Sequence, residues 1–259
     1  MVGKMGGTYL SSDNRDMSEK RWQDVLFSQG FGTRRVCLGL IQQGLVAHQG
    51  ITVTDDAEWV ETDDLHFTVQ GERWPYHEQA YLMLHKPAGT ECSQKASLYP
   101  SIYTLLPGPL RQRGGGAAAG VQAVGRLDQD TTGLLILSDD GKFIHRLTSP
   151  KHHVPKVYEV TTKHPIDADQ ISRLVAGVVL DDDPKPVSAH AAEQTGTHTL
   201  RLTLTQGKYH QVKRMLAAVS NRVEGLHRSR IGSLTLADLP EGQWRWLTAD
   251  EVKAVSAKA

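Results

Sequence analysis

Apolar residues at helical and strand spacings divide the first part of the chain into short elements. A helical pattern over 21–29 is followed by a second helix that Thr33 caps and Gly44 ends. Apolar runs over 45–53 and 65–69 predict strands, the first of them folded into a hairpin. We expect the second helix to bury one apolar face, made of Val36, Leu40 and Ile41.

The rest of the chain carries apolar runs that predict the elements of a larger domain. Runs over 121–124 and 134–137 predict two strands that flank a polar loop. Three leucines alternate over 200–204 and predict a half-buried strand, and an apolar face over 212–219 predicts the helix that follows. The pattern Thr248-x-x-Glu251 is a capping box and predicts a final helix.

Composition predicts how these elements are grouped. The polar, glycine-containing start at 1–17 lacks the apolar centre of a secretory signal, and we expect it to be a disordered leader. A polar segment over 72–79 is expected to join two domains, for which 259 residues are long enough. The expected domains are 18–73 and 80–259, and the Gly- and Ala-rich stretch 110–122 predicts an enlarged mobile loop in the second.

Charge is balanced overall but unevenly distributed. The formal net charge of zero argues against a simple electrostatic nucleic-acid binder. Basic residues nevertheless concentrate over 142–163 and 201–230, each stretch with a single acidic residue, whereas acidic residues gather over 55–64. Two basic stretches of this kind suit the binding of phosphates, and the alternative is a solvated protein face.

Other features exclude several classes of protein. No apolar run approaches the ~20 residues of a membrane span, so no membrane partner is expected. Cys37 and Cys92 form neither a disulfide framework nor a zinc site, which favours a reducing cytoplasm. Four histidines lack the spacing of a zinc motif, so no metal is expected at His145, His152, His153 and His164.

The polar loop between two predicted strands, 125–134, is the most informative stretch of the chain. It reads Gly-Arg-Leu-Asp-Gln-Asp-Thr-Thr-Gly-Leu, and apolar runs at both ends allow it to present a side chain accurately. Asp128 is the candidate, because Arg126 and other basic residues would keep its carboxylate ionised. Asp, Thr and Gly are also the residues of ordinary turns, and one Asp beside one Arg does not decide between the two interpretations.

Several motifs together resemble those of RNA pseudouridine synthases. The loop 125–134, called the signature loop below, is similar to the loop that carries the catalytic aspartate in that family. Lys156 and Tyr158 match its second motif, Lys-x-Tyr, and 207–215 is similar to its third. The stretch 85–89 is similar to the segment that opens the synthase domain, with a histidine in place of the usual asparagine.

The resemblance implies a reaction and a role for each matched residue. The bond between N1 and C1′ of a uridine breaks, the base rotates and rejoins through C5, and no cofactor is needed. Asp128 supplies the carboxylate, acting on the sugar or the base, and Lys213 is its cationic partner. Tyr158 stacks on the flipped uracil, the alternative being a half-buried strand tyrosine, and Arg126 fills the gap or holds a phosphate. Further RNA contacts are implied for Lys156, His210, Gln211 and Arg214.

A second resemblance concerns the first domain. The helix pair with Gly-Thr-Arg-Arg at 32–35 and Gly-Leu-Val at 44–46 resembles the S4 RNA-binding domain. In that family the arginines at the start of the second helix meet the RNA backbone, which implies RNA contacts for Arg34 and Arg35. The alternative is that both are exposed helix residues. Trp-Gln-Asp at 22–24 departs from the usual Leu-Asp-Lys and, with the acidic second half, predicts weak RNA affinity.

The resemblance also implies the fold class and the substrate. The expected fold is α+β, with a small S4-like domain followed by a catalytic domain that has a mixed, mainly antiparallel sheet and flanking helices. The stretches 149–153, 210–215 and 226–232 are most similar to the synthases of small-subunit (16S) ribosomal RNA. We therefore expect a cytoplasmic monomer acting on uridine 516 of that RNA, free or in an assembly intermediate. A large-subunit synthase and a non-catalytic S4-type assembly factor are the alternatives.

Overall fold

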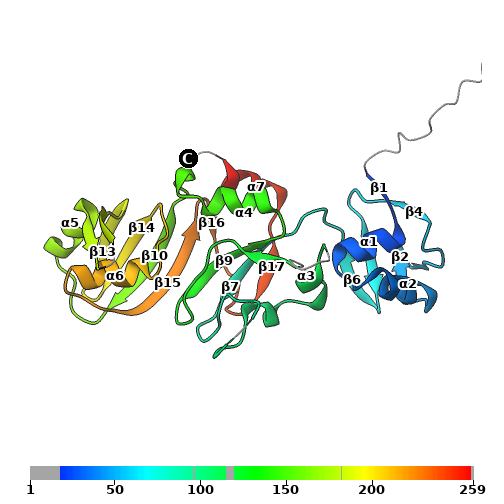
Figure 1. The fold of residues 1–259 in the computed structure, drawn as a ribbon, viewed down its shortest axis with the longest axis horizontal. Helices are drawn as coiled ribbons and strands as arrows, with labels where there is room; N and C mark the ends of the chain where they lie inside the picture. Colours follow the sequence, from blue (N-terminus) through cyan, green and yellow to red (C-terminus); the bar gives the residue numbers. More distant parts are fainter. Residues whose placement is uncertain (1–17, 96, 115–119, 182, 258–259) are drawn as a thin grey trace, which may run out of the picture. The chain divides into compact units, whose positions relative to one another are not determined.

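Two units with separate hydrophobic cores make up the chain. The computed structural model describes residues 18–95, 97–114, 120–181 and 183–257 (Figure 1). The leader expected at 1–17 and the centre of the Gly- and Ala-rich loop lie outside the described residues. The first unit is Met1–Glu78 and the second is Gln79–Ala259.

The first unit packs two helices against a small antiparallel sheet. Its elements are β1 (Glu19–Arg21), α1 (Trp22–Gln29), α2 (Arg34–Gln42), β2 (Val46–His48), β3 (Ile51–Thr52), β4 (Trp59–Glu61), β5 (His66–Val69) and β6 (Glu72–Pro75). The sheet has the order β3-β2-β5-β6, and β1 pairs with β4. Its core joins Trp22 and Leu26 of α1, Ile41 of α2 and Phe67 of β5.

Helix α2 has its expected cap but buries a different side chain. The Thr33 hydroxyl accepts a hydrogen bond from the backbone N–H of Val36, at 3.3 Å. Val36 is itself 48% exposed, so the expected apolar face was wrong at this position, and Cys37 is buried instead. The adjacent turn explains the difference, because the Val36 side chain lies over Gly32, where an added Cβ would come within 2.8 Å of it.

The end of the first unit also differs from the expected linker over 72–79. Residues Glu72–Pro75 form strand β6, which pairs with β5 along its whole length. Trp74 packs against the core and Tyr76 is buried, which the polar composition of this stretch does not reveal. Pro75 is tolerated because β6 is an edge strand of the sheet.

The second unit is built on a nine-stranded mixed sheet. Its strands are β7 (Tyr81–Lys86), β8 (Gln122–Ala123), β9 (Thr132–Ser138), β10 (Lys156–Thr162), β13 (Ala191–Gly196), β14 (Thr199–Leu204), β15 (Val223–Ile231), β16 (Leu234–Thr235) and β17 (Trp244–Trp246). The order is β13-β14-β10-β15-β9-β7-β17, with β16 beside β15 and β8 beside β9. Within the described ranges, each pair is antiparallel except β9 with β15. The expected α+β class with a mainly antiparallel sheet is confirmed.

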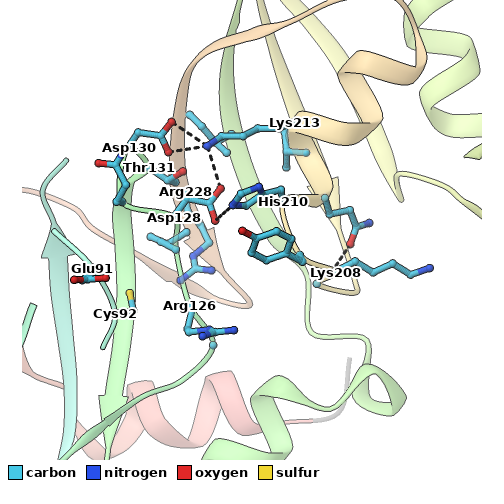
Figure 2. Close-up of a pocket in the computed structure, with 18 of the residues that line it drawn as sticks. Glu91, Cys92, Arg126, Asp128, Asp130, Thr131, Lys208, His210, Lys213 and Arg228 are labelled. Carbon is cyan, nitrogen blue, oxygen red and sulfur yellow. Dashed lines mark hydrogen bonds and ion pairs between the residues drawn. The ribbon is translucent and has the colours of Figure 1, made fainter. Parts of the chain in front are cut away.

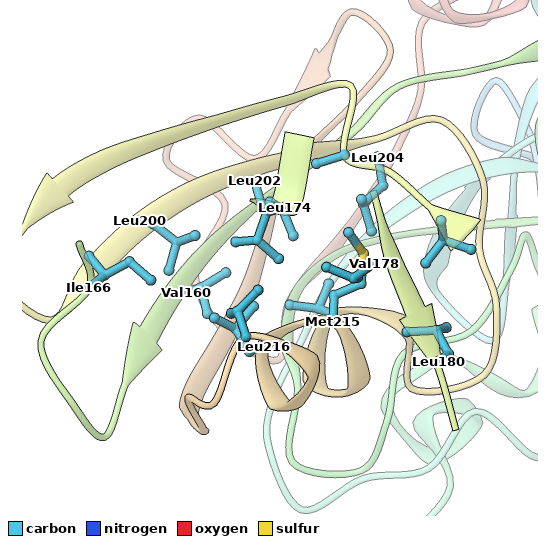
Figure 3. Close-up of a cluster of buried hydrophobic side chains, with 14 residues drawn as sticks. Val160, Ile166, Leu174, Val178, Leu180, Leu200, Leu202, Leu204, Met215 and Leu216 are labelled. Carbon is cyan, nitrogen blue, oxygen red and sulfur yellow. The ribbon is translucent and has the colours of Figure 1, made fainter. Parts of the chain in front are cut away.

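Helices pack against this sheet in two groups. The remaining elements are η1 (Ile102–Leu105), α3 (Gly108–Gln112), α4 (Gly141–Thr148), η2 (Pro150–His152), α5 (Ala168–Ala176), β11 (Val178–Leu180), β12 (Asp183–Val187), α6 (Gln211–Ala218) and α7 (Ala249–Ser256). Met215 and Leu216 of α6 face the leucines of β14 in one core (Figure 3). Helices α4 and α7 lie side by side over the other (Figure 1). Helix α7 has both hydrogen bonds of its expected capping box.

The parallel pairing of β9 with β15 brings the signature loop to the middle of the sheet. Gly133, near the start of β9, lies opposite Arg228 of β15. Its φ of +115° is unfavourable for side chains other than glycine, and an added Cβ would lie 2.3 Å from the Arg228 carbonyl oxygen. Glycine therefore allows the two strands to approach, and this approach fixes the loop that immediately precedes β9.

Candidate active site

A cavity of about 780 Å³ opens beside the signature loop (Figure 2). Its walls come from the loop, from β10 and β15, from the segment leading into α6, and from residues between 91 and 99. A volume in this range is typical of sites for small organic ligands. Seven residues singled out from the sequence line it: Arg126, Asp128, Lys156, Tyr158, His210, Gln211 and Lys213.

A buried lysine holds the signature loop in place. Lys86, at the end of β7, is fully buried, and its ammonium donates hydrogen bonds to the carbonyl oxygens of Pro87, Gln129 and Thr131 at 3.0, 3.3 and 2.9 Å. Burial lowers the pKa of Lys86. The Thr131 backbone N–H in turn donates to the Asp128 carbonyl at 3.1 Å. The backbone from Asp128 to Thr131 is thus fixed by contacts within the protein.

The carboxylate of Asp128 shares its cationic partner with a second carboxylate. Lys213 Nζ lies 3.1 Å from Asp128 Oδ2, and it donates to the two oxygens of Asp130 at 2.7 and 2.9 Å. Burial opposes the charge of Lys213, but the hydrogen bonds and charges of both carboxylates outweigh it and raise the pKa of Lys213. The same contact lowers the pKa of Asp130 despite its partial burial. The lysine is therefore held charged beside Asp128.

A histidine and a tyrosine extend this cluster toward solvent. His210 Nε2 lies 3.4 Å from Asp128 Oδ1, and Figure 2 shows Asp128, His210 and Lys213 pointing toward one another. The backbone of His210 has a positive φ of 48° at the start of α6, which directs its ring to the cavity. The Tyr209 ring stacks on the His210 ring at 3.8 Å between centroids and is 73% exposed. Sequence analysis gave Tyr209 no role, although its place inside the third motif was a usable signal.

Strands β10 and β15 supply the inner wall of the cavity. Tyr158 and Arg228 lie opposite each other on these strands and both line the cavity. Lys156 donates to the Val154 carbonyl at 3.0 Å, and burial, with the neighbouring charge of Arg228, lowers the pKa of Lys156 to about 8. Arg228 is 2% exposed, and its Nε donates to the Leu134 carbonyl at 2.8 Å. From the sequence, Arg228 was placed in a basic stretch and in the family-like stretch 226–232, but it was given no role of its own.

The other residues of the second unit for which RNA contacts were expected are Arg126, Gln211 and Arg214, and they lie in different surroundings. Arg126 is exposed and lines the cavity (Figure 2). Gln211 is buried, its side-chain oxygen accepts from the Lys208 backbone N–H at 2.8 Å, and its Nε2 contacts Met215 Sδ at 3.7 Å. Arg214 donates to the Tyr209 carbonyl at 3.1 Å and does not line the cavity. Gln211 and Arg214 thus hold the turn before α6.

The two arginines of the first unit lie at the start of α2, where the sequence predicted them. Arg34 forms an ion pair with Asp24 of α1, and its guanidinium lies 4.7 Å from the centre of the Phe27 ring. Arg35 is exposed. Asp24 is one of the residues at which the sequence departs from the S4 pattern, and here its charge offsets that of Arg34.

The described residues contain neither a metal-binding cluster nor a membrane-spanning helix. In the ranges that the structure describes, no group of three or more His, Cys, Asp or Glu side chains is arranged to hold a metal ion. Over the same ranges, none of the helices is both long and apolar enough to cross a membrane.

Comparisons with known proteins agree on one family. Residues 80–218 match the family described as RNA pseudouridylate synthase. This chain belongs to that family. Pseudouridylate synthases are isomerases, and the signature loop, β10 and α6 all fall inside the matched stretch. A solved structure titled "Crystal structure of pseudouridylate synthase" superposes with a TM-score of 0.63 and 34% identity, covering 91% of this chain and 99% of that one.

Named relatives of this pseudouridylate synthase cover nearly the same length. The chain is 40% identical over 223 residues to the ribosomal small subunit pseudouridine synthase A of Pasteurella multocida, covering 85% of this chain and 92% of the relative. It is 38% identical over 233 residues to the protein of the same name in Haemophilus influenzae, covering 89% and 97%. The similarity thus extends well beyond the stretch matched by the family.

Proposed function

We propose that this pseudouridylate synthase isomerises one uridine of small-subunit (16S) ribosomal RNA to pseudouridine. The observation that carries this proposal is the Asp128 carboxylate. It lines a cavity 3.1 Å from the Lys213 ammonium, on a loop whose backbone is held by Lys86 at Gln129 and Thr131. The names of the relatives support the small-subunit RNA as substrate. Uridine 516 is the target that we propose, in free RNA or in an assembly intermediate.

In the proposed reaction Asp128 is the catalytic carboxylate. It attacks C1′ of the sugar, removes a proton from the sugar, or attacks the base, and in each route the bond between N1 and C1′ breaks. Lys213 Nζ and His210 Nε2 lie 3.1 and 3.4 Å from its two oxygens, so the charged ammonium of Lys213 directly faces the carboxylate. Asp130 keeps Lys213 in position, since the two are joined by hydrogen bonds at 2.7 and 2.9 Å.

The remaining residues are assigned by where they line the cavity. Tyr158 offers an aromatic face on which the flipped uracil stacks, an interaction worth about 1–3 kcal/mol per base. Arg126 is exposed on the lining, where it can hold a phosphate of the target nucleotide or occupy the gap that the base leaves. Lys156 and His210 are proposed as RNA contacts. Gln211 and Arg214 act on the RNA only through the turn that they hold.

The first unit is proposed to be an S4-like module that positions the RNA, and the second unit is proposed to be the catalytic domain. Arg35 is the more available of its two arginines, because Arg34 is paired with Asp24. A weak contribution to affinity follows from this pairing. Because the proposed substrate is ribosomal RNA, the cytoplasm is the proposed compartment. A monomer is the proposed form of the protein.

The function is tested by incubating the purified protein with in vitro transcribed small-subunit RNA and mapping pseudouridine at single-nucleotide resolution. One new pseudouridine, at uridine 516, is the expected result. Modification of large-subunit RNA alone would favour the large-subunit alternative. Tight RNA binding without pseudouridine in either RNA, or in assembly intermediates, would favour the non-catalytic assembly factor.

A further inference from the structure

Arg228 is a buried positive charge that the protein itself leaves without a counterion. It is 2% exposed, and no described carboxylate forms an ion pair with it. Of its three nitrogens only Nε has a hydrogen-bond partner among the described residues, the Leu134 carbonyl at 2.8 Å. Burying a charge without a partner is costly, so a purely structural side chain at this position would be expected to be apolar.

The surroundings of Arg228 increase this cost. Its neighbour Lys156 is half-buried and also basic, and burial together with the charge of Arg228 lowers the pKa of Lys156 to about 8. The carboxylates of Asp128 and Asp130 are both engaged by Lys213. The inner wall therefore carries two positive charges that no carboxylate in the described chain balances by an ion pair.

A second polar group that lines the cavity, on the signature loop, also lacks a partner among the described residues. The Thr131 hydroxyl is buried, lines the cavity and has no hydrogen-bond partner among the described residues. Gly133, two residues after Thr131, lies opposite Arg228, and the two backbones approach closely. This approach limits how far the Arg228 backbone can move away from the cavity. The Thr131 hydroxyl and the Arg228 guanidinium are thus two polar groups in the lining of one cavity that lack hydrogen-bond partners among the described residues. We infer that the bound substrate supplies these partners.

The position of Arg228 decides which part of the substrate it meets. RNA phosphates remain on the continuous backbone and are suited to exposed cations such as Arg126 (Figure 2). A group that is 2% exposed on the inner wall, opposite Tyr158, is reached by the base that is turned into the cavity. Uracil presents carbonyl oxygens on its edge, and these accept hydrogen bonds from a guanidinium.

We propose that Arg228 is a catalytic residue that donates a hydrogen bond to a carbonyl oxygen of the flipped uracil and stabilises the uracil anion. This inference rests on the proposed function. When the bond between N1 and C1′ breaks, its electron pair stays with the base, and the negative charge spreads from N1 to the carbonyl oxygens. In one route Asp128 bonds to C1′ and is released as the carboxylate when C5 attacks C1′; in another, the sugar proton taken by Asp128 returns when C5 attacks. The base then loses the proton on C5 and gains one at N1, so the product is neutral. A fixed cation at the carbonyl oxygen offsets this charge without reorganisation.

The test replaces Arg228 by Met, which keeps the length of the side chain and removes the charge. Single-turnover rates at saturating RNA are expected to fall about 100- to 1,000-fold, as when one preorganised donor to a developing anion is removed. RNA affinity should change less than about threefold, and the melting temperature should be unchanged or higher because a buried unpaired charge is removed. Arg173→Met is the control, because Arg173 is exposed on α5 and lies outside both the cavity lining and the basic stretches; it should retain the wild-type rate.

Two further substrates distinguish the base from the phosphate as the partner of Arg228. RNA with 5-fluorouridine at the target carries a base whose anion is stabilised by the fluorine and whose C5 has no proton to lose. The rate compared for both substrates is therefore that of N1–C1′ bond cleavage, and the loss caused by Arg228→Met should be about tenfold smaller with 5-fluorouridine than with uridine. RNA with a neutral methylphosphonate at the target should show the same loss as unmodified RNA. Three results would each overturn the proposal. Arg228→Met could lose the same factor in rate with uridine and with 5-fluorouridine, it could lose nothing with the methylphosphonate RNA, or it could keep the wild-type rate on unmodified RNA.

A structural role is excluded by the same measurements. If Arg228→Met lowers the melting temperature and Arg228→Lys restores stability and rate together, the side chain supports the fold and the proposal is wrong. If the wild-type protein forms no pseudouridine in any ribosomal RNA, the proposed function fails, and this outcome is known before any variant is compared.

Discussion

Replacing Gly133 by Ala tests the contact that joins the signature loop to the sheet. The new Cβ would lie 2.3 Å from the Arg228 carbonyl oxygen and 2.6 Å from its nitrogen, so the strands must separate by about 1 Å to reach ordinary contact. The separation should break about two backbone hydrogen bonds, which contribute about 0.5–1.5 kcal/mol each. Alanine at a positive φ adds about 1–3 kcal/mol of backbone strain. The free energy of unfolding should therefore fall by about 2–6 kcal/mol. This is a large share of the stability of an ordinary domain.

Because the chain has two units, the loss should be measured within the second one. Urea unfolding combined with hydrogen exchange of peptides from β9 and β15 gives a local free energy, and protection of both strands is expected to fall. Gly141→Ala is the matched control, since Gly141 begins α4 and an added Cβ there meets no atom within 4 Å. It should be neutral or up to about 1 kcal/mol more stable. If Gly133→Ala and Gly141→Ala behaved alike, the close approach of β9 and β15 would not control this sheet.

Three other predictions concern charge. Lys213→Met should lower the single-turnover rate at saturating RNA more than it lowers affinity, and an effect on affinity alone would contradict its role beside Asp128. Burial and the charge of Arg228 lower the pKa of Lys156 to about 8, so Lys156 is protonated below that pH and neutral above it. Because Lys156 is a proposed RNA contact, activity should decline as the pH rises through about 8. This decline should be absent in Lys156→Met. Replacing Arg34 and Arg35 together by Ala should flatten the salt dependence of RNA binding by at most about two units and spare the saturated rate, and a collapse of that rate would mean that the first unit helps to build the active site.

Features that depend on local sequence could be predicted well. The signature loop was located because apolar runs mark the strands on either side of it, and the buried face of α6 follows from four apolar positions at helical spacing. The mixed, mainly antiparallel sheet followed from the family resemblance. The strand β6 was missed because its composition is polar, although Trp74 and Tyr76 supply apolar contacts.

Features that depend on distant pairing could not be read from the chain. Asp130 shares Lys213 with Asp128 across 83 residues, and no spacing rule connects a loop to a helix at that distance. Arg228 belongs to a stretch that looks like a solvated basic face, and its burial follows only from the pairing of β15 with β9 and β10. Lys86 lies in a recognised motif, but its bonds to the loop at 129–131 exist only in the folded sheet.

The central claim is that the Asp128 carboxylate carries out the isomerisation in this cavity. Asp128→Asn keeps the shape of the side chain and removes its charge, so the fold and RNA binding should remain, and the mapped pseudouridine in small-subunit RNA should disappear. Folding is checked by the melting temperature, and binding by titration of the same RNA. Conversion by folded Asp128→Asn at a rate comparable to that of the wild-type protein would contradict the account.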